Sequence, residues 1–236
     1  MSGISQGKLG HHVSELVIII LGVLIALAVD QWNDGRRERG LEAAYLEALE
    51  GDLRSDSVRY ADLFLPALAT KDSALSAIAP VIRGAPLRGD TLAFLSTVAL
   101  GGRLGSAQPT GLARRTTFDE LIATGNLSLI RAPSLRAALV DHYNQDQIQA
   151  SRLKARVPDY PMAVHAYYPA ELRGERAPGD VRAFGLRRAV EGFRSPQFEA
   201  VMDQEFNYMY LARAVMQSMA DETNELLRRV ESARER

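Results

Sequence analysis

Residues 14–40 read SELVIIILGVLIALAVDQWNDGRRERG, and this stretch decides how the chain is built. Leu16–Val29 contains fourteen residues without a polar side chain. As a helix these residues span about 21 Å at 1.5 Å per residue, whereas the hydrocarbon core of a bilayer is about 30 Å thick. Extension to residues 13–32 supplies the missing length. We therefore predict a single transmembrane helix over 13–32, preceded by a short tail over 1–12.

The ends and one face of this segment carry the residues that favour a membrane position. Glu15 and Asp30 would lie at the two interfaces, and Trp32 would lie at headgroup level, where an indole is favoured. Gly22 and Ala26 form a small-xxx-small pair that allows two membrane helices to approach closely. Glycine and alanine are also simply common in such helices, so this pair does not by itself predict a contact.

Two alternatives compete with the anchor. A secretory signal could use Ala26-Leu27-Ala28 as a cleavage site, but the leading segment has only Lys8 and the amino terminus as firm positive charges, and Glu15 interrupts that segment. A buried core helix would need enclosure on every side, which a chain of 236 residues offers in few places. The anchor is the prediction that the hydropathy favours.

The remaining residues, 33–236, show helical periodicity and no convincing strand alternation. We predict an all-α fold in which an extramembrane helical bundle follows the anchor. The expected helices are a stalk over 36–65 that Pro66 breaks or bends, then 67–82, 91–100 with Asp90 as N-cap, 116–124, 133–156 and a long last helix over 196–234. The prolines at 158, 161 and 169 are expected to prevent a regular helix there, and 101–111 is expected to be a loop.

The last helix has a heptad pattern. Met202, Met209, Met216, Thr223 and Val230 recur every seven residues. Such a repeat is typical of a helix that packs lengthwise against others in a bundle or coiled coil.

Two stretches together resemble an uncharacterised bacterial family, a domain of unknown function, of single-span membrane-anchored helical proteins. The first contains Glu15, Gly22, residues 24–27 and Trp32-Asn33 with the arginine-rich turn that follows; the second contains residues 117–121, 125–130, 134–136 and Tyr143-Asn144. Members usually have a basic amino-terminal tail, which implies a cytoplasmic tail and a periplasmic bundle. Here the tail is nearly neutral, and Arg36, Arg37 and Arg39 after the span favour the opposite orientation by the positive-inside rule. The resemblance implies no activity.

The sequence carries no catalytic or metal-binding motif. There is no cysteine, no zinc-binding histidine motif, no nucleotide-binding loop and no serine-nucleophile motif. His11, His12, His142 and His165 lack ligand spacing, and Asp119-Glu120 diverge on a helix by about 100° per residue. We predict no enzyme activity, no cofactor and no metal. A net charge of −1 also gives no basic field for nucleic acid.

These features predict an accessory or scaffold subunit that holds together a larger bacterial inner-membrane complex. Its expected partners are membrane lipid and integral membrane subunits, with a respiratory or photosynthetic assembly as a natural host, and a homo-oligomer is left open. Aromatic residues that could form a partner surface are Tyr167, Tyr168, Phe206 and Tyr210. The alternative is an extracytoplasmic sensor or ligand-binding module that acts through a partner.

Overall fold

A computed structural model describes residues 6–102, 112–169, 172 and 179–235, with side chains from residue 20 onward. This described part contains helices and no strand, which confirms the all-α prediction. The helices are α1 Gln6–Arg59, α2 Leu65–Ile82, α3 Thr91–Gly101, α4 Thr116–Ala123, α5 Pro133–Lys154, α6 Tyr160–Tyr167, α8 Gly179–Phe193 and α9 Pro196–Arg234. A π-helical turn, η1, covers Tyr60–Phe64, and a 3₁₀ turn, η2, covers Asn126–Leu129.

The first three elements form one uninterrupted helical rod over residues 6–82. The stalk was predicted to break or bend at Pro66, and the helix does not break there. The π turn ends two residues before this proline, and the N–H of Leu65 donates to the carbonyl of Tyr60, five residues earlier. The wider turn accommodates a residue that has no N–H and whose ring would collide with the preceding turn. A second proline, Pro80, also lies inside α2.

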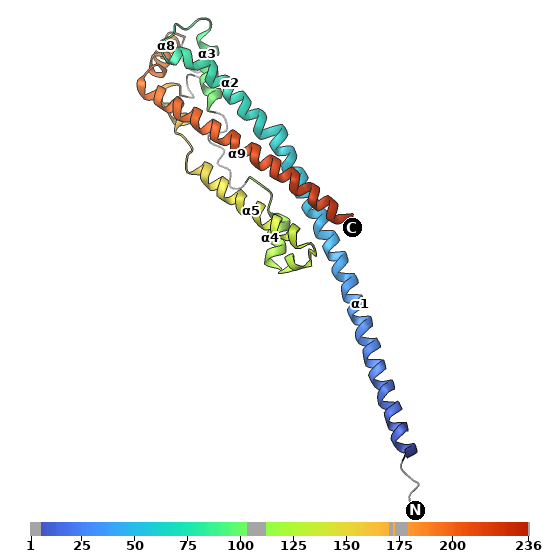
Figure 1. Ribbon diagram of the computed structural model, residues 1–236. Helices are drawn as coiled ribbons and strands as arrows, with labels where there is room; N and C mark the ends of the chain where they lie inside the picture. Colours follow the sequence, from blue (N-terminus) through green and yellow to red (C-terminus); the bar gives the residue numbers. More distant parts are fainter. Residues whose placement is uncertain (1–5, 103–111, 170–171, 173–178, 236) are drawn as a thin grey trace, which may run out of the picture.

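The first half of α1 projects from the bundle, whereas its second half lies alongside α9 (Figure 1). Among the residues whose side chains are described, no helix has a stretch long and apolar enough to cross a membrane. The predicted span begins at residue 13, so its first seven residues, including Glu15, lie outside those side chains. The structure supports a helix over this segment and does not support the transmembrane part of the prediction.

Helix α9 is the centre of the bundle and packs against α1, α2 and α5 (Figure 1). All five heptad residues, Met202, Met209, Met216, Thr223 and Val230, are buried. The lengthwise packing predicted from this repeat is confirmed.

The core consists of three clusters arranged along α9. The cluster farthest from the projecting part of α1 joins α2, α3, α6, α8 and the start of α9, and includes Leu75, Tyr160 and Phe198. The middle cluster contains Tyr60 and Met209. The third joins α1, α4, α5 and the end of α9, and its members include Leu49, Leu53, Phe118, Tyr143 and Val230.

Helix boundaries agree with several local predictions. Asp90 caps α3, because its carboxylate accepts from the N–H groups of Leu92 and Ala93 at 3.0 and 3.3 Å. Gly125 follows α4 with a left-handed φ of 72°. The region of three prolines nevertheless contains α6, since Pro161 stands in the first turn, where a proline is tolerated. Most of the predicted 101–111 loop lies outside the described residues.

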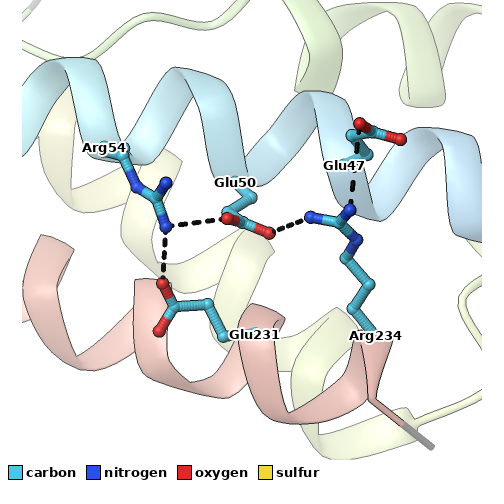
Figure 2. A network of polar contacts seen from close by, with 5 residues as sticks. All are labelled: Glu47, Glu50, Arg54, Glu231 and Arg234. Atoms are coloured by element: carbon cyan, nitrogen blue, oxygen red, sulfur yellow. Dashed lines mark hydrogen bonds and ion pairs between the residues drawn. The ribbon is translucent and has the colours of Figure 1, made fainter.

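An ion-pair network joins the end of α9 to α1 (Figure 2). Arg54 binds Glu50 at 2.8 Å and Glu231 at 2.9 Å, and Arg234 binds Glu50 at 2.6 Å and Glu47 at 3.8 Å. Isolated surface pairs contribute at most about 1 kcal/mol, but a network with shared partners restrains geometry better than single pairs do. These contacts hold the end of α9 at the part of α1 where the rod leaves the bundle.

Candidate functional site

The projecting part of α1 exposes a stretch of large apolar side chains. The exposed fractions are 50% for Ile20, 57% for Leu21, 54% for Val23, 56% for Leu24, 57% for Ile25, 52% for Leu27, 56% for Val29 and 63% for Trp32. We refer to residues 20–32 as the apolar stretch. These exposed apolar side chains are contiguous, whereas the surface of a soluble protein ordinarily carries such residues singly.

The predicted interface residues Gly22, Ala26, Asp30 and Trp32 lie exposed within this stretch. A Cβ built at Gly22 would meet no other atom within 4 Å, so the described chain itself leaves the small face open. The Arg36 guanidinium lies 5.9 Å from the centre of the Trp32 ring. This cation–π contact places a positive charge next to the indole at the end of the stretch.

The four aromatic residues predicted as a partner surface do not form one exposed surface. Tyr168 is buried, and Tyr167 packs edge-on against Phe193 and Phe198 in the core. Phe206 and Tyr210 lie one turn apart on α9 with ring centres 6.4 Å apart. Tyr210 is the one of the four that is exposed, so the predicted surface reduces to the Phe206–Tyr210 pair.

Three aspartates fix the segment that leads into α4. Asp146 of α5 accepts from the N–H groups of Leu112 and Ala113, both at 2.8 Å. From α1, Asp56 accepts from the N–H of Arg114 at 2.7 Å, and Asp52 accepts from the N–H and hydroxyl of Thr117. The aspartates thus satisfy backbone donors that no helix satisfies, and they join α4 to both α1 and α5.

The electrostatics of this cluster reflect burial. Removal from water raises the pKa of Asp56 and of Asp146, against the lowering effect of their N–H donors and of Arg59, whose guanidinium lies 3.0 Å from Asp56. Burial likewise raises the pKa of Tyr60 and Tyr143. This arrangement holds the segment that leads into α4 in place against α1 and α5.

We expect Asp146→Ala to lower the free energy of unfolding by about 2 kcal/mol, because two buried N–H groups lose their acceptor. Asp146→Asn keeps the accepting oxygen and should cost less than about 1 kcal/mol. Chemical denaturation followed by circular dichroism measures both. The matched control is Asp141→Ala, an exposed aspartate on the same helix, which should change stability by less than about 0.5 kcal/mol. Equal effects at 146 and 141 would contradict this role.

The middle of the bundle contains a buried ion pair that sequence reasoning missed. Lys71 of α2 contacts Glu205 of α9, and both side chains are fully buried. The Lys71 ammonium also lies 5.7 Å from the centre of the Tyr208 ring. The signal was present in the heptad pattern, since position 205 falls on the buried stripe between Met202 and Met209.

No group of three or more histidine, cysteine or acidic side chains within the described residues could hold a metal ion. Comparisons of the chain with protein-family models, curated proteins and solved structures found no match. The family resemblance and the expected lack of enzyme activity therefore stay predictions.

Proposed function

We propose that this protein is a non-catalytic scaffold subunit, anchored in a bacterial inner membrane by residues 13–32. The single observation that supports the anchor is the apolar stretch, which lies outside the bundle on a helix continuous with it. Membrane lipid and integral membrane subunits of a larger complex are the proposed partners.

The distribution of the apolar stretch around the helix favours lipid over one partner helix. At 100° per residue, the side chains at 20, 21, 23, 25 and 29 point in directions that go round the whole helix. A partner helix covers one stripe of its neighbour, whereas hydrocarbon covers every side. Each leucine, isoleucine or valine at the centre of a membrane helix contributes about 0.3–0.6 kcal/mol to insertion.

The scaffold role is supported by the form of the rest of the chain. The rod of residues 6–82 runs directly into a bundle organised along α9, and its buried polar groups hold helices together. The resemblance described above implies a periplasmic bundle, and we adopt this orientation for a single-pass topology. Reporter fusions at residue 236 and at residue 1 test it directly.

The anchor is tested by placing two charges within it. Val23→Arg/Leu24→Arg should cost about 6 kcal/mol of insertion free energy, at about 3 kcal/mol per arginine. We expect wild-type protein to remain in the membrane pellet after an alkaline wash and this variant to be released. The matched control is Val58→Arg/Leu63→Arg, because these residues are equally exposed, at 53% and 54%, but lie next to the bundle. Release of the wild type by the same wash would contradict the anchor.

The scaffold role is tested separately. Purification of the full-length protein from its membrane in mild detergent should retain a fixed set of integral membrane proteins in stoichiometric amounts. Recovery of this chain alone, as a monomer or homo-oligomer, would contradict the scaffold role while leaving the anchor intact. That result would favour the alternative, an extracytoplasmic ligand-binding module that acts through a partner.

A further inference from the structure

Basic and acidic side chains separate around α1 where the apolar stretch ends. At 100° per residue, Arg36 lies about 40° and Arg39 about 20° from the direction of Trp32. All three side chains are exposed. We call these three residues the basic face. It places two positive charges beside an indole on one side of the projecting helix.

The acidic side chains of the same segment lie on the other side of the helix. Asp30 and Asp34 are about 160° and Glu38 about 120° from Trp32, with Arg37 among them at about 140°. The charges of residues 30–39 sum to zero, but they are not mixed. A helix with its side chains is about 10–12 Å across, which exceeds the screening length of about 8 Å at physiological salt. The acidic side therefore weakens the field of the basic face only in part.

The two arginines of the basic face have no acidic partner. Partners on a helix surface stand three or four residues apart. No acidic residue occupies those positions around Arg36, and the one beside Arg39 is Glu42, whose carboxylate binds Arg131 instead. Neither arginine forms an ion pair within the part of the chain that the structure describes. Two like charges three residues apart repel each other, and an anion between them would relieve this repulsion.

The side chain of Arg36 runs back toward the apolar stretch. Its guanidinium lies 5.9 Å from the centre of the Trp32 ring, one turn nearer the amino terminus. With Trp32 at the membrane surface, Arg36 and Arg39 stand about 6 and 10 Å farther along the helix axis. The headgroup layer is about 5–7 Å deep on each side of a bilayer. Because helical side chains lean toward the amino terminus and arginine has a long stem, both guanidinium groups can reach the lipid phosphates.

We propose that the basic face binds the headgroup of one anionic phospholipid, with its phosphate between Arg36 and Arg39. This inference rests on the anchor proposed above. Arginine donates two parallel hydrogen bonds to phosphate oxygens. A zwitterionic headgroup brings its own cation, which the same arginines repel, so the face prefers a lipid with net negative charge. An acyl chain would lie along Ile25 and Leu21, which are exposed and within about 20° of the direction of Trp32.

The chain contains a natural probe of this site, because Trp32 is its single tryptophan. The full-length protein is reconstituted into phosphatidylcholine vesicles in which phosphatidylglycerol makes up about one fifth of the lipid. Bromine atoms, which quench indole fluorescence on contact, are placed on the acyl chains of one of the two lipids at a time. Quenching divided by the mole fraction of the brominated lipid gives the preference at Trp32. We expect a preference of about threefold or more for phosphatidylglycerol.

The outcomes separate this inference from the anchor. Quenching of Trp32 by brominated phosphatidylcholine without any preference for phosphatidylglycerol would overturn the lipid site and leave the anchor intact. Absence of quenching by either lipid would overturn both, since Trp32 would then lie away from the membrane.

Variants assign the preference to the basic face. Arg36→Gln/Arg39→Gln should abolish it, and Arg39→Gln alone should lower it about twofold. The matched control is Arg37→Gln, which removes the same charge from an exposed position on the acidic side and should keep the preference. These residues lie outside the packed bundle, and comparison of two brominated lipids within one variant cancels any change in the brightness of Trp32. Equal losses in Arg37→Gln and Arg39→Gln would overturn the site, because the attraction would then depend on net charge alone.

Discussion

Glu205→Leu is expected to lower the free energy of unfolding by about 3–5 kcal/mol, because it leaves the Lys71 ammonium buried without its carboxylate. Both side chains are fully buried between α2 and α9. Burial raises the pKa of Glu205, against the lowering effect of Lys71, which indicates how costly the missing solvation is. Denaturation of the full-length protein, followed by circular dichroism, measures the loss.

The double variant Lys71→Met/Glu205→Leu separates the attraction between the two charges from the free-energy cost of removing them from water. Two apolar side chains of similar size can replace a buried ion pair at little or no cost. We therefore expect stability within about 1 kcal/mol of the wild type, although each single variant is strongly destabilised. The surface control is Glu199→Leu, whose exposed pair with Arg83 at 3.5 Å should contribute less than about 1 kcal/mol. Additive losses in the double variant would show that the two charges are not coupled.

Gly192→Ala is expected to cost about 3 kcal/mol of stability. A Cβ at this position would lie 2.2 Å from Cδ1 of Tyr167 and 2.8 Å from Cε1 of the same ring. The ring cannot retreat freely, since it packs against Phe193 and Phe198 in the core. Overpacking of this kind shifts the backbone and typically costs 1–3 kcal/mol, here at the upper end. Thermal denaturation of the full-length protein provides the measurement.

The matched control is expected to change stability in the opposite direction. Gly51→Ala replaces an exposed glycine in α1 whose added Cβ would meet no atom within 4 Å. Alanine is about 1 kcal/mol more favourable than glycine inside a helix, so this variant should gain stability. If both variants shifted the melting temperature in the same direction, the close approach of α6 and α8 would not be the cause.

The sequence predicted the parts of the fold that depend on strong local signals. The heptad of α9 and the Asp90 cap each predict one local outcome, and the structure has both. Helix α8 was missed because Gly179–Phe193 has glycines at 185 and 192, which argue against a helix locally. Those glycines are explained by tertiary contacts, since Leu172 and Tyr167 approach them closely.

The site residues were harder to predict because their roles depend on partners far along the chain. Asp146 lies 33 and 34 residues from the two N–H groups that it binds. Lys71 and Glu205 are likewise distant in sequence. Lysine and glutamate usually lie on a protein surface, so only the packing of α2 against α9 shows that these two are buried. The sequence indicates only that His142 lacks the spacing of a metal ligand, and its burial could not be read from its neighbours.

Under the anchor proposed above, the uninterrupted rod of residues 6–82 has a geometric consequence. From Trp32 to Glu42, which binds Arg131 at the near end of the bundle, ten residues set a gap of about 15 Å. The same residues set the azimuth of the bundle about the membrane normal. Insertion of one residue between 33 and 41 would raise the bundle by about 1.5 Å and turn it by about 100°. The length of this helix and the direction that the bundle faces are thus coupled. A flexible tether would absorb a change of length, whereas here the same change would turn a different side of the bundle toward its neighbours in the membrane.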